Sequence, residues 1–190
     1  MASKLREYQK KEPRAEIFEE LGVQHGTARI DYAIINGEMS GYEIKSDRDT
    51  LERLPEQVRE FNEVFDKLTL VVGKRYLYKA IHEIQEWWGI ILAKENADEK
   101  VVLQIIREPS QNPLQQSISI ARLLWREEAL KILEQRNEAD GLRSKPRELI
   151  YQKLAEVFSA DLKTLKQHVS STLITREGWR SDPRLVTYGG

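Results

Sequence analysis

The sequence contains no cysteine among its 190 residues. Disulfides and cysteine-ligated zinc sites are therefore excluded, and this composition agrees with a reducing, cytoplasmic compartment. Histidine is scarce, and its three copies are too scattered to indicate a metal-binding group: His25, His82 and His168. No run of about 18 apolar residues occurs, so we expect no membrane-spanning helix. The charged start MASKLREYQKKEPR does not resemble a secretory signal.

The sequence also has almost no net charge, because 30 basic residues nearly balance 31 acidic ones. Such a chain lacks the strongly basic surface that is typical of many nucleic-acid-binding proteins. The balance is uneven, since the part from residue 115 onward carries a modest excess of basic side chains. This excess permits a DNA-facing surface in the second half but does not establish one.

Residues 28–45 are predicted to form a β-hairpin, because Asn36-Gly37 between two alternating runs is a strong turn signal. A two-residue loop would leave Glu43 on the face opposite Asp31. A three-residue loop would place Asp31 directly across from Glu43. The second register is predicted, because a slip by one residue would scatter the apolar side chains that it gathers on one face: Ile30, Tyr32, Ile34, Tyr42 and Ile44.

The other face of this hairpin would carry Asp31, Glu43 and Lys45, together with Arg29. Cross-strand partners lie about 4.5–5.5 Å apart at Cβ, so two carboxylates in that position repel each other unless a cation lies between them. Carboxylate and water ligands suit Mg²⁺ or Mn²⁺. The alternative is an ordinary solvated face on which the two basic residues neutralise the two acidic ones. The residues alone leave both interpretations open.

An Asp on one strand and Glu-x-Lys on the next resemble the PD-(D/E)XK nuclease superfamily. The longer run GYEIKSDRDTLERLPEQ, followed by FNEVFDKLTLVV, resembles a largely uncharacterised bacterial and phage subfamily within it. The similarity extends from about Glu20 to Gly89, and Ile30 stands where the superfamily name has proline. The resemblance implies an α/β fold with a restriction-endonuclease-like core, in which helices flank a mixed central sheet.

The resemblance also implies a role for each residue of the hairpin site. Asp31, Glu43 and the backbone carbonyl of Ile44 would bind Mg²⁺ or Mn²⁺. Lys45 would orient or deprotonate the attacking water and offset charge in the transition state.

Two further residues enter the site through the same resemblance. Gln57, four residues before Phe61, resembles the helical Gln-x-x-x-Tyr element of RecB-type nucleases. Glu20 resembles the upstream acidic residue that completes the metal site in many members. Its neighbour Glu19 is the alternative, and both could instead be part of a solvated helix end.

Periodicity and turn signals divide the chain into a nuclease-like core at 1–108, a proline-containing linker at 108–117 and a C-terminal helical region at 118–180. Residues 4–11 have helix-like spacing, and residues 14–21 read either as a helix or, over 17–23, as a first strand. Asp49-Thr50 is expected to cap a helix that continues to about residue 65. A further helix is expected at 77–86, and strands at 67–72, 89–93 and 101–107.

The C-terminal region is predicted to contain helices at 118–136, 145–158 and 161–174, with Asp161 as the N-cap of the last. The short turn between the last two allows a DNA-reading helix-turn-helix. The favoured alternative is a helical hairpin that packs on the sheet through residues such as Leu149, Leu154 and Leu165.

These observations predict a metal-dependent deoxyribonuclease that acts in DNA repair, restriction or phage DNA metabolism. The alternatives are a non-catalytic DNA-binding module on the same fold and an interaction or regulatory protein with solvated hairpin charges. Whether the chain forms a homo-oligomer is left open. Seven side chains are predicted to contact DNA, mostly at phosphates: Arg29, Ser46, Arg143, Lys145, Arg147, Lys163 and Lys166.

Overall fold

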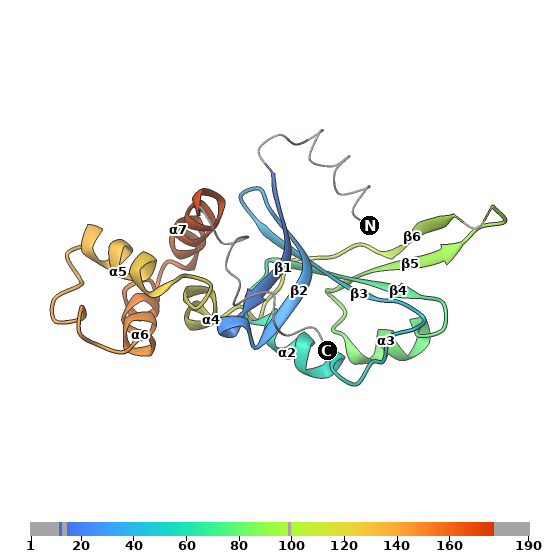
Figure 1. Ribbon diagram of the computed structural model, residues 1–190, viewed down its shortest axis with the longest axis horizontal. Helices are drawn as coiled ribbons and strands as arrows, with labels where there is room; N and C mark the ends of the chain where they lie inside the picture. Colours follow the sequence, from blue (N-terminus) through green and yellow to red (C-terminus); the bar gives the residue numbers. More distant parts are fainter. Residues whose placement is uncertain (1–11, 13–14, 99, 177–190) are drawn as a thin grey trace.

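A six-stranded mixed sheet is the centre of the molecule in the computed structural model, which describes residues 12, 15–98 and 100–176 (Figure 1). The strands follow one another across the sheet in chain order, and β3–β4 and β4–β5 are its parallel pairs. The strands are β1 (Glu16–Val23), β2 (Ala28–Ile35), β3 (Met39–Lys45), β4 (Lys67–Gly73), β5 (Gly89–Glu95) and β6 (Val101–Arg107).

Two helices supply the crossovers that the parallel pairs require. Helix α2 (Leu54–Asn62) connects β3 to β4, and α3 (Leu77–Glu83) connects β4 to β5. Both lie below the sheet in Figure 1, and their apolar faces belong to the same buried cluster as the interior of β4. The predicted fold class is therefore confirmed: a mixed sheet with flanking helices and a helical C-terminal extension.

Helix α2 begins later than predicted. Arg53 is its N-cap residue and Pro55 lies in its first turn, where a missing N–H costs no helical hydrogen bond. Asp49 does not cap it, because this side chain accepts a hydrogen bond of 2.6 Å from the backbone N–H of Ser46. The segment between β3 and α2 is thus a loop in which a hydrogen bond joins two residues of the loop itself.

The N-terminal ambiguity is resolved in favour of a strand. β1 pairs antiparallel with β2 from Glu16 onward, so the helical interpretation is wrong for residues 16–21, which belong to this strand. A short 3₁₀ turn, η1 (Gln24–Gly26), joins the two strands. The helix predicted at 4–11 lies outside the described residues.

The C-terminal region contains α4 (Ser117–Ala121), α5 (Arg126–Gln135), α6 (Arg147–Val157) and α7 (Leu162–Thr175). The helix predicted at 118–136 is therefore two helices, separated between Ala121 and Arg126. The N-cap prediction is confirmed, since Asp161 accepts a hydrogen bond of 3.0 Å from the Thr164 N–H. None of the described helices is both long and apolar enough to cross a bilayer.

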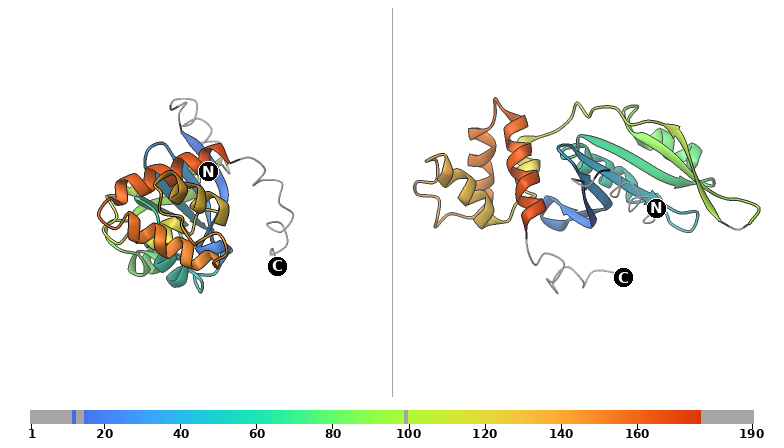
Figure 2. Two further views of the ribbon diagram at one scale, coloured as in Figure 1. Left: turned by 90° about the vertical axis from the view of Figure 1, so that its left-hand side faces the viewer. Right: turned by 90° about the horizontal axis from the view of Figure 1, so that it is seen from above.

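Helices α6 and α7 do not pack on the sheet as predicted. They contact α4 and α5 instead, and the four helices gather beyond one end of the sheet (Figure 2). Leu149, expected in that interface, is 44% exposed. Most of the buried apolar residues still form one cluster that continues from the sheet into these helices, and a smaller cluster lies around Ala15 and Ile34. The division into a core at 1–108 and a helical region at 118–180 stays a prediction.

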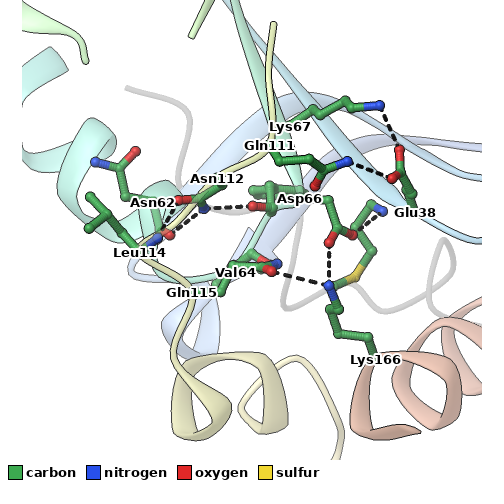
Figure 3. Close-up of polar contacts among 12 residues, drawn as sticks. Glu38, Asn62, Val64, Asp66, Lys67, Gln111, Asn112, Leu114, Gln115 and Lys166 are labelled. Atoms are coloured by element: carbon green, nitrogen blue, oxygen red, sulfur yellow. Dashed lines mark hydrogen bonds and ion pairs between the residues drawn. The ribbon is translucent and has the colours of Figure 1, made fainter. Parts of the chain in front are cut away.

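The segment predicted as a linker is held firmly at the base of the sheet (Figure 3). The Asn112 amide donates to the carbonyls of Asn62 and Phe65, at 2.6 and 2.7 Å. Asp66 accepts from the Met39 N–H at 2.7 Å and forms an ion pair with Lys166 of α7. Asp66 is 3% exposed, so this ion pair attaches the helical region to the start of β3 and β4.

The substitution Lys166→Met is expected to destabilise the protein by about 3 kcal/mol, because it leaves the buried Asp66 carboxylate without its cation. Urea denaturation followed by circular dichroism measures the change. Lys163→Met, at an exposed position on the same helix, is the matched control and should change stability by less than about 0.5 kcal/mol. Equal midpoints for the two variants would contradict a structural role for Lys166.

Candidate active site

The hairpin between β2 and β3 has the predicted register. Ile35 pairs with Met39 and Tyr32 with Tyr42, and the ladder ends there, so Asp31 and Glu43 follow directly beside the last pair. The three-residue loop is closed by a hydrogen bond of 3.1 Å from the Asn36 N–H to the Glu38 carbonyl.

The prediction about which face of the hairpin is buried is wrong in part. Glu43 is 1% exposed, whereas Tyr32 and Tyr42 on the opposite face are half-buried. Ile30, predicted to lie on the face of the two tyrosines, belongs instead to the main core cluster. The reason is that β2 and β3 are interior strands, flanked by β1 and β4, and one of their faces packs against the main core. On that face a side chain at Gly41 would clash with Ile30, because its Cβ would lie 2.4 Å from the Ile30 Cδ1 atom.

Asp31 is fixed by the neighbouring strand. Its Oδ2 atom accepts a hydrogen bond of 2.6 Å from the backbone N–H of Ile44. Burial raises the pKa of Asp31, while this hydrogen bond and the Lys45 ammonium act to lower it. The carboxylate is thus held at the point where the ladder between β2 and β3 ends.

Glu43 and Lys45 form a close pair beside it. The Lys45 Nζ atom lies 2.6 Å from the Glu43 Oε1 atom, and the side chains are 12% and 2% exposed. Burial, followed by the charge of Asp31, raises the pKa of Glu43 to about 7 despite the nearby ammonium. The second oxygen, Oε2, is buried and makes no hydrogen bond to any described residue. A buried acceptor of this kind is unfavourable unless a cation or donor occupies the space before it.

Helix α2 brings Gln57 to the same place. This side chain is 7% exposed, and its Oε1 atom is a second buried acceptor that lacks a hydrogen bond within the described part of the chain. The Gln57 amide is close enough to Glu43 to lower the pKa of that carboxyl. Arg53 also lines the cleft, one helical turn before Gln57, and sequence reasoning missed it. Its i, i+4 spacing from Gln57 was the available signal.

Glu20 joins the site through a distortion of β1. Its φ angle is +54°, a left-handed conformation that is uncommon for residues other than glycine. Burial, then the charge of Asp31, raises the pKa of Glu20, so the two carboxyl groups interact. Glu19 lines the same cleft, but the charge interaction with Asp31 is found for Glu20.

These side chains surround an open cleft of about 850 Å³. Its walls come from β1, the η1 turn, β2, β3, the following loop and α2. Acidic side chains outnumber basic ones in the lining, which includes Glu19, Glu20, Asp31, Glu43, Asp49, Arg29, Lys45 and Arg53. The cleft therefore favours a cation among its carboxylates.

The donor set fits a divalent cation of the magnesium type. Within residues 12, 15–98 and 100–176, no three acidic or histidine side chains form a ready-made metal cluster. Mg²⁺ does not require one, since it usually keeps several waters and takes only one or two protein carboxylates. Asp31 and Glu43 would supply these, with the free Oε2 atom of Glu43 as the clearest position.

The residues predicted to contact DNA are scattered. Arg29 lines the cleft, whereas Ser46 lies in the adjoining loop and is not part of the lining. The prediction that Lys166 contacts DNA is corrected, because its ammonium forms an ion pair with Asp66. It also donates a hydrogen bond of 3.1 Å to the Gln115 side chain.

The other predicted cations are exposed, and Arg143 pairs with Glu134 at 2.6 Å. Arg147 lies close to the η1 turn, since burial and then the charge of Arg147 lower the pKa of His25 there. Lys145 and Lys163 have no ion pair with a described residue.

The fold and the site define a mixed α/β protein with Asp31 and Lys45 clustered around a buried Glu43 in an acidic cleft. The chain belongs to the bacteriophage P4 protein cII family, whose profile matches residues 2–184. Protein cII of Enterobacteria phage P4 is 33% identical over 82 residues, which are 43% of this chain. The match spans 31% of the length of that relative.

Among solved structures, SfsA of Pyrococcus furiosus in complex with Ca²⁺ is similar at 14% identity and a TM-score of 0.32. The match covers 56% of this chain and 59% of that one. At this level of similarity nothing about the site follows.

Glu43→Gln is expected to stabilise the metal-free protein at pH 8 and not at pH 4. The folded protein holds the Glu43 proton with a pKa of about 7, against 4.5 ordinarily, so folding stability falls as pH rises through this range. That difference corresponds to roughly 3 kcal/mol, which the neutral amide avoids.

Urea denaturation with a chelator at both pH values measures the effect. Glu95→Gln, at an exposed position on β5, is the control. If the stability difference between Glu43→Gln and the unaltered protein did not change with pH, this result would contradict the raised pKa of Glu43.

Proposed function

We propose that the protein is a metal-dependent deoxyribonuclease of the PD-(D/E)XK type. The observation that supports this most directly is the buried Glu43 carboxylate, which has one oxygen on Lys45 and the other without a partner in the described chain. The phage relative favours phage DNA metabolism over repair or restriction as its setting.

The chemistry follows from the positions of the side chains. Asp31 and Glu43 would hold Mg²⁺ or Mn²⁺, with the Ile44 carbonyl and Glu20 as further candidate ligands. When bound, the ion would lower the pKa of a coordinated water and offset charge on the phosphate. Lys45 places a positive charge within the cleft, where it can donate to a phosphate oxygen or orient the attacking water. Gln57 presents its amide to the same space.

A second candidate is a non-catalytic DNA-binding module on the same fold. Such a module needs no metal, and the described residues contain no ready-made three-ligand metal cluster. The two candidates differ in what Mg²⁺ or Mn²⁺ should do, and this difference sets the test.

Asp31→Asn and Lys45→Ala are each expected to reduce DNA cleavage by at least about 10²-fold, by loss of a metal ligand and of transition-state stabilisation respectively. Cleavage is measured on linear, nicked, branched and single-stranded DNA with Mg²⁺ or Mn²⁺. Mn²⁺ should raise the melting temperature of the unaltered protein and of Lys45→Ala, and should raise that of Asp31→Asn much less.

Asp98→Asn and Lys100→Ala are the matched controls, because they repeat the acidic-x-Lys spacing in the turn between β5 and β6. Both should cleave at the unaltered rate. A stabilising effect of Mn²⁺ without cleavage of any substrate would favour the non-catalytic module. Unaltered cleavage by Asp31→Asn or Lys45→Ala would refute the mechanism.

The exposed cations at the start of α6 and just before it are proposed to contact DNA phosphates. Replacing Arg143, Lys145 and Arg147 together by alanine should reduce the steepness of the slope of log affinity against log salt concentration by about two to three units. Each duplex phosphate contact contributes roughly 0.9 to this slope. The change should be similar for unrelated DNA sequences, because phosphates carry no sequence information. Fluorescence anisotropy with a chelator, or with Ca²⁺ in place of Mg²⁺, measures binding without cleavage.

The control replaces Lys94 of β5 and Lys100, just before β6, by alanine. The β5–β6 pair lies at the opposite end of the molecule from the C-terminal helices (Figure 1). Loss of the two lysines should leave the slope within about one unit of the unaltered value. An unchanged slope and affinity in the triple variant would assign this part of the helical region to structure or to another partner.

A further inference from the structure

The edge strand β6 has features of an interface that the site does not explain. It ends the strand order, and no described strand pairs with its outer side. Figure 1 shows β5 and β6 extending away from the helices as a two-stranded ribbon. Most of its apolar side chains are exposed, on both faces: Val101 63%, Val102 38%, Ile105 57% and Ile106 44%.

Edge strands are usually protected against pairing with another chain by charged side chains, proline or a bulge. Residues 101–106 contain neither a charge nor a proline. Arg107, the one cation of β6, is turned inward and donates to the carbonyls of Trp88 and Gln85 at 2.6 and 3.0 Å. The register irregularity of the β5–β6 pair lies near Ile106, so residues 101–105 form a regular and unprotected stretch.

This stretch is complementary to itself. Val101, Leu103 and Ile105 alternate on one face, next to Glu95, Ala93 and Ile91 of β5. An antiparallel copy related by a two-fold axis at Leu103 would pair the Val101 of each chain with the Ile105 of the other. Leu103 would face its own copy, so each apolar side chain on this face would meet an apolar partner. Such an isologous contact closes with two chains and does not propagate.

We propose that two copies of this chain pair through β6, antiparallel and centred on Leu103, to make one continuous twelve-stranded sheet. Edge pairing fits better than packing of one ribbon face on another, because it pairs the backbone groups on the outer side of β6, which face packing would leave unpaired. A nucleic acid does not fit this edge, since residues 101–106 offer no cation. The proposal is independent of the nuclease assignment.

Sedimentation equilibrium of the full chain over about 2–200 µM tests the proposal, because this range brackets micromolar dissociation constants. The mass should rise from 22.2 kDa towards twice that value. The double variant V101K/I105K would place lysine opposite lysine across the two-fold axis and should stay monomeric. The double variant V101E/I105K would place opposite charges across the axis and should regain dimers.

Tyr78→Lys, at a position 80% exposed on α3, is the control for a loss of surface hydrophobicity and should dimerise normally. Circular dichroism confirms that every variant is folded. Amide hydrogen exchange in residues 101–105 should slow as the concentration rises, which packing between ribbon faces would not produce. A monomer at every concentration, dimers of V101K/I105K, or the failure of V101E/I105K to pair would overturn the proposal.

Discussion

The cleft depends on one constraint, which is the burial of the Glu43 carboxylate in the interior of a six-stranded sheet. A charge in that position is unfavourable unless neighbouring groups compensate for it. Lys45 does so for one oxygen, and the remaining oxygen lacks a partner among the described residues. The kink in β1, the end of the β2–β3 ladder at Asp31 and the placement of Gln57 all bring further polar groups to this carboxylate. The arrangement costs stability, and a site that binds a cation would recover it.

Much of the sheet could be predicted from local patterns. The Asn-Gly turn and the alternation around it determined the β2–β3 register, and the β-branched runs located β4, β5 and β6. β1 could not be separated from a helix, because its strand character comes from pairing with β2 and not from its own sequence. The break between α4 and α5 was missed for a similar reason, since residues 118–136 contain neither proline nor glycine to mark it.

The same distinction applies to the site. Asp31, Glu43 and Lys45 could be grouped from sequence because a hairpin brings them together locally. In the structure all three line the same cleft. That Glu43 is buried could not be predicted from the hairpin, because burial depends on β4 and on α2. Lys166 was assigned to a DNA-binding surface for its charge alone. Its partner Asp66 is a hundred residues away in sequence, so no local pattern could identify the pair.

The segment before α4 has a consequence for how the protein can be divided. Asn112 bonds the end of α2, Gln115 bonds the Val64 carbonyl at 2.8 Å, and the backbone N–H of Gln116 bonds the Glu63 carbonyl at 2.8 Å. A chain shortened to end at β6 would lose these partners and leave carbonyls at the C-terminal end of α2 unsatisfied. Limited proteolysis should therefore spare residues 108–116 despite their lack of regular structure. A shortened protein would therefore need to keep this segment together with Lys166 of α7, the cation that pairs with the buried Asp66.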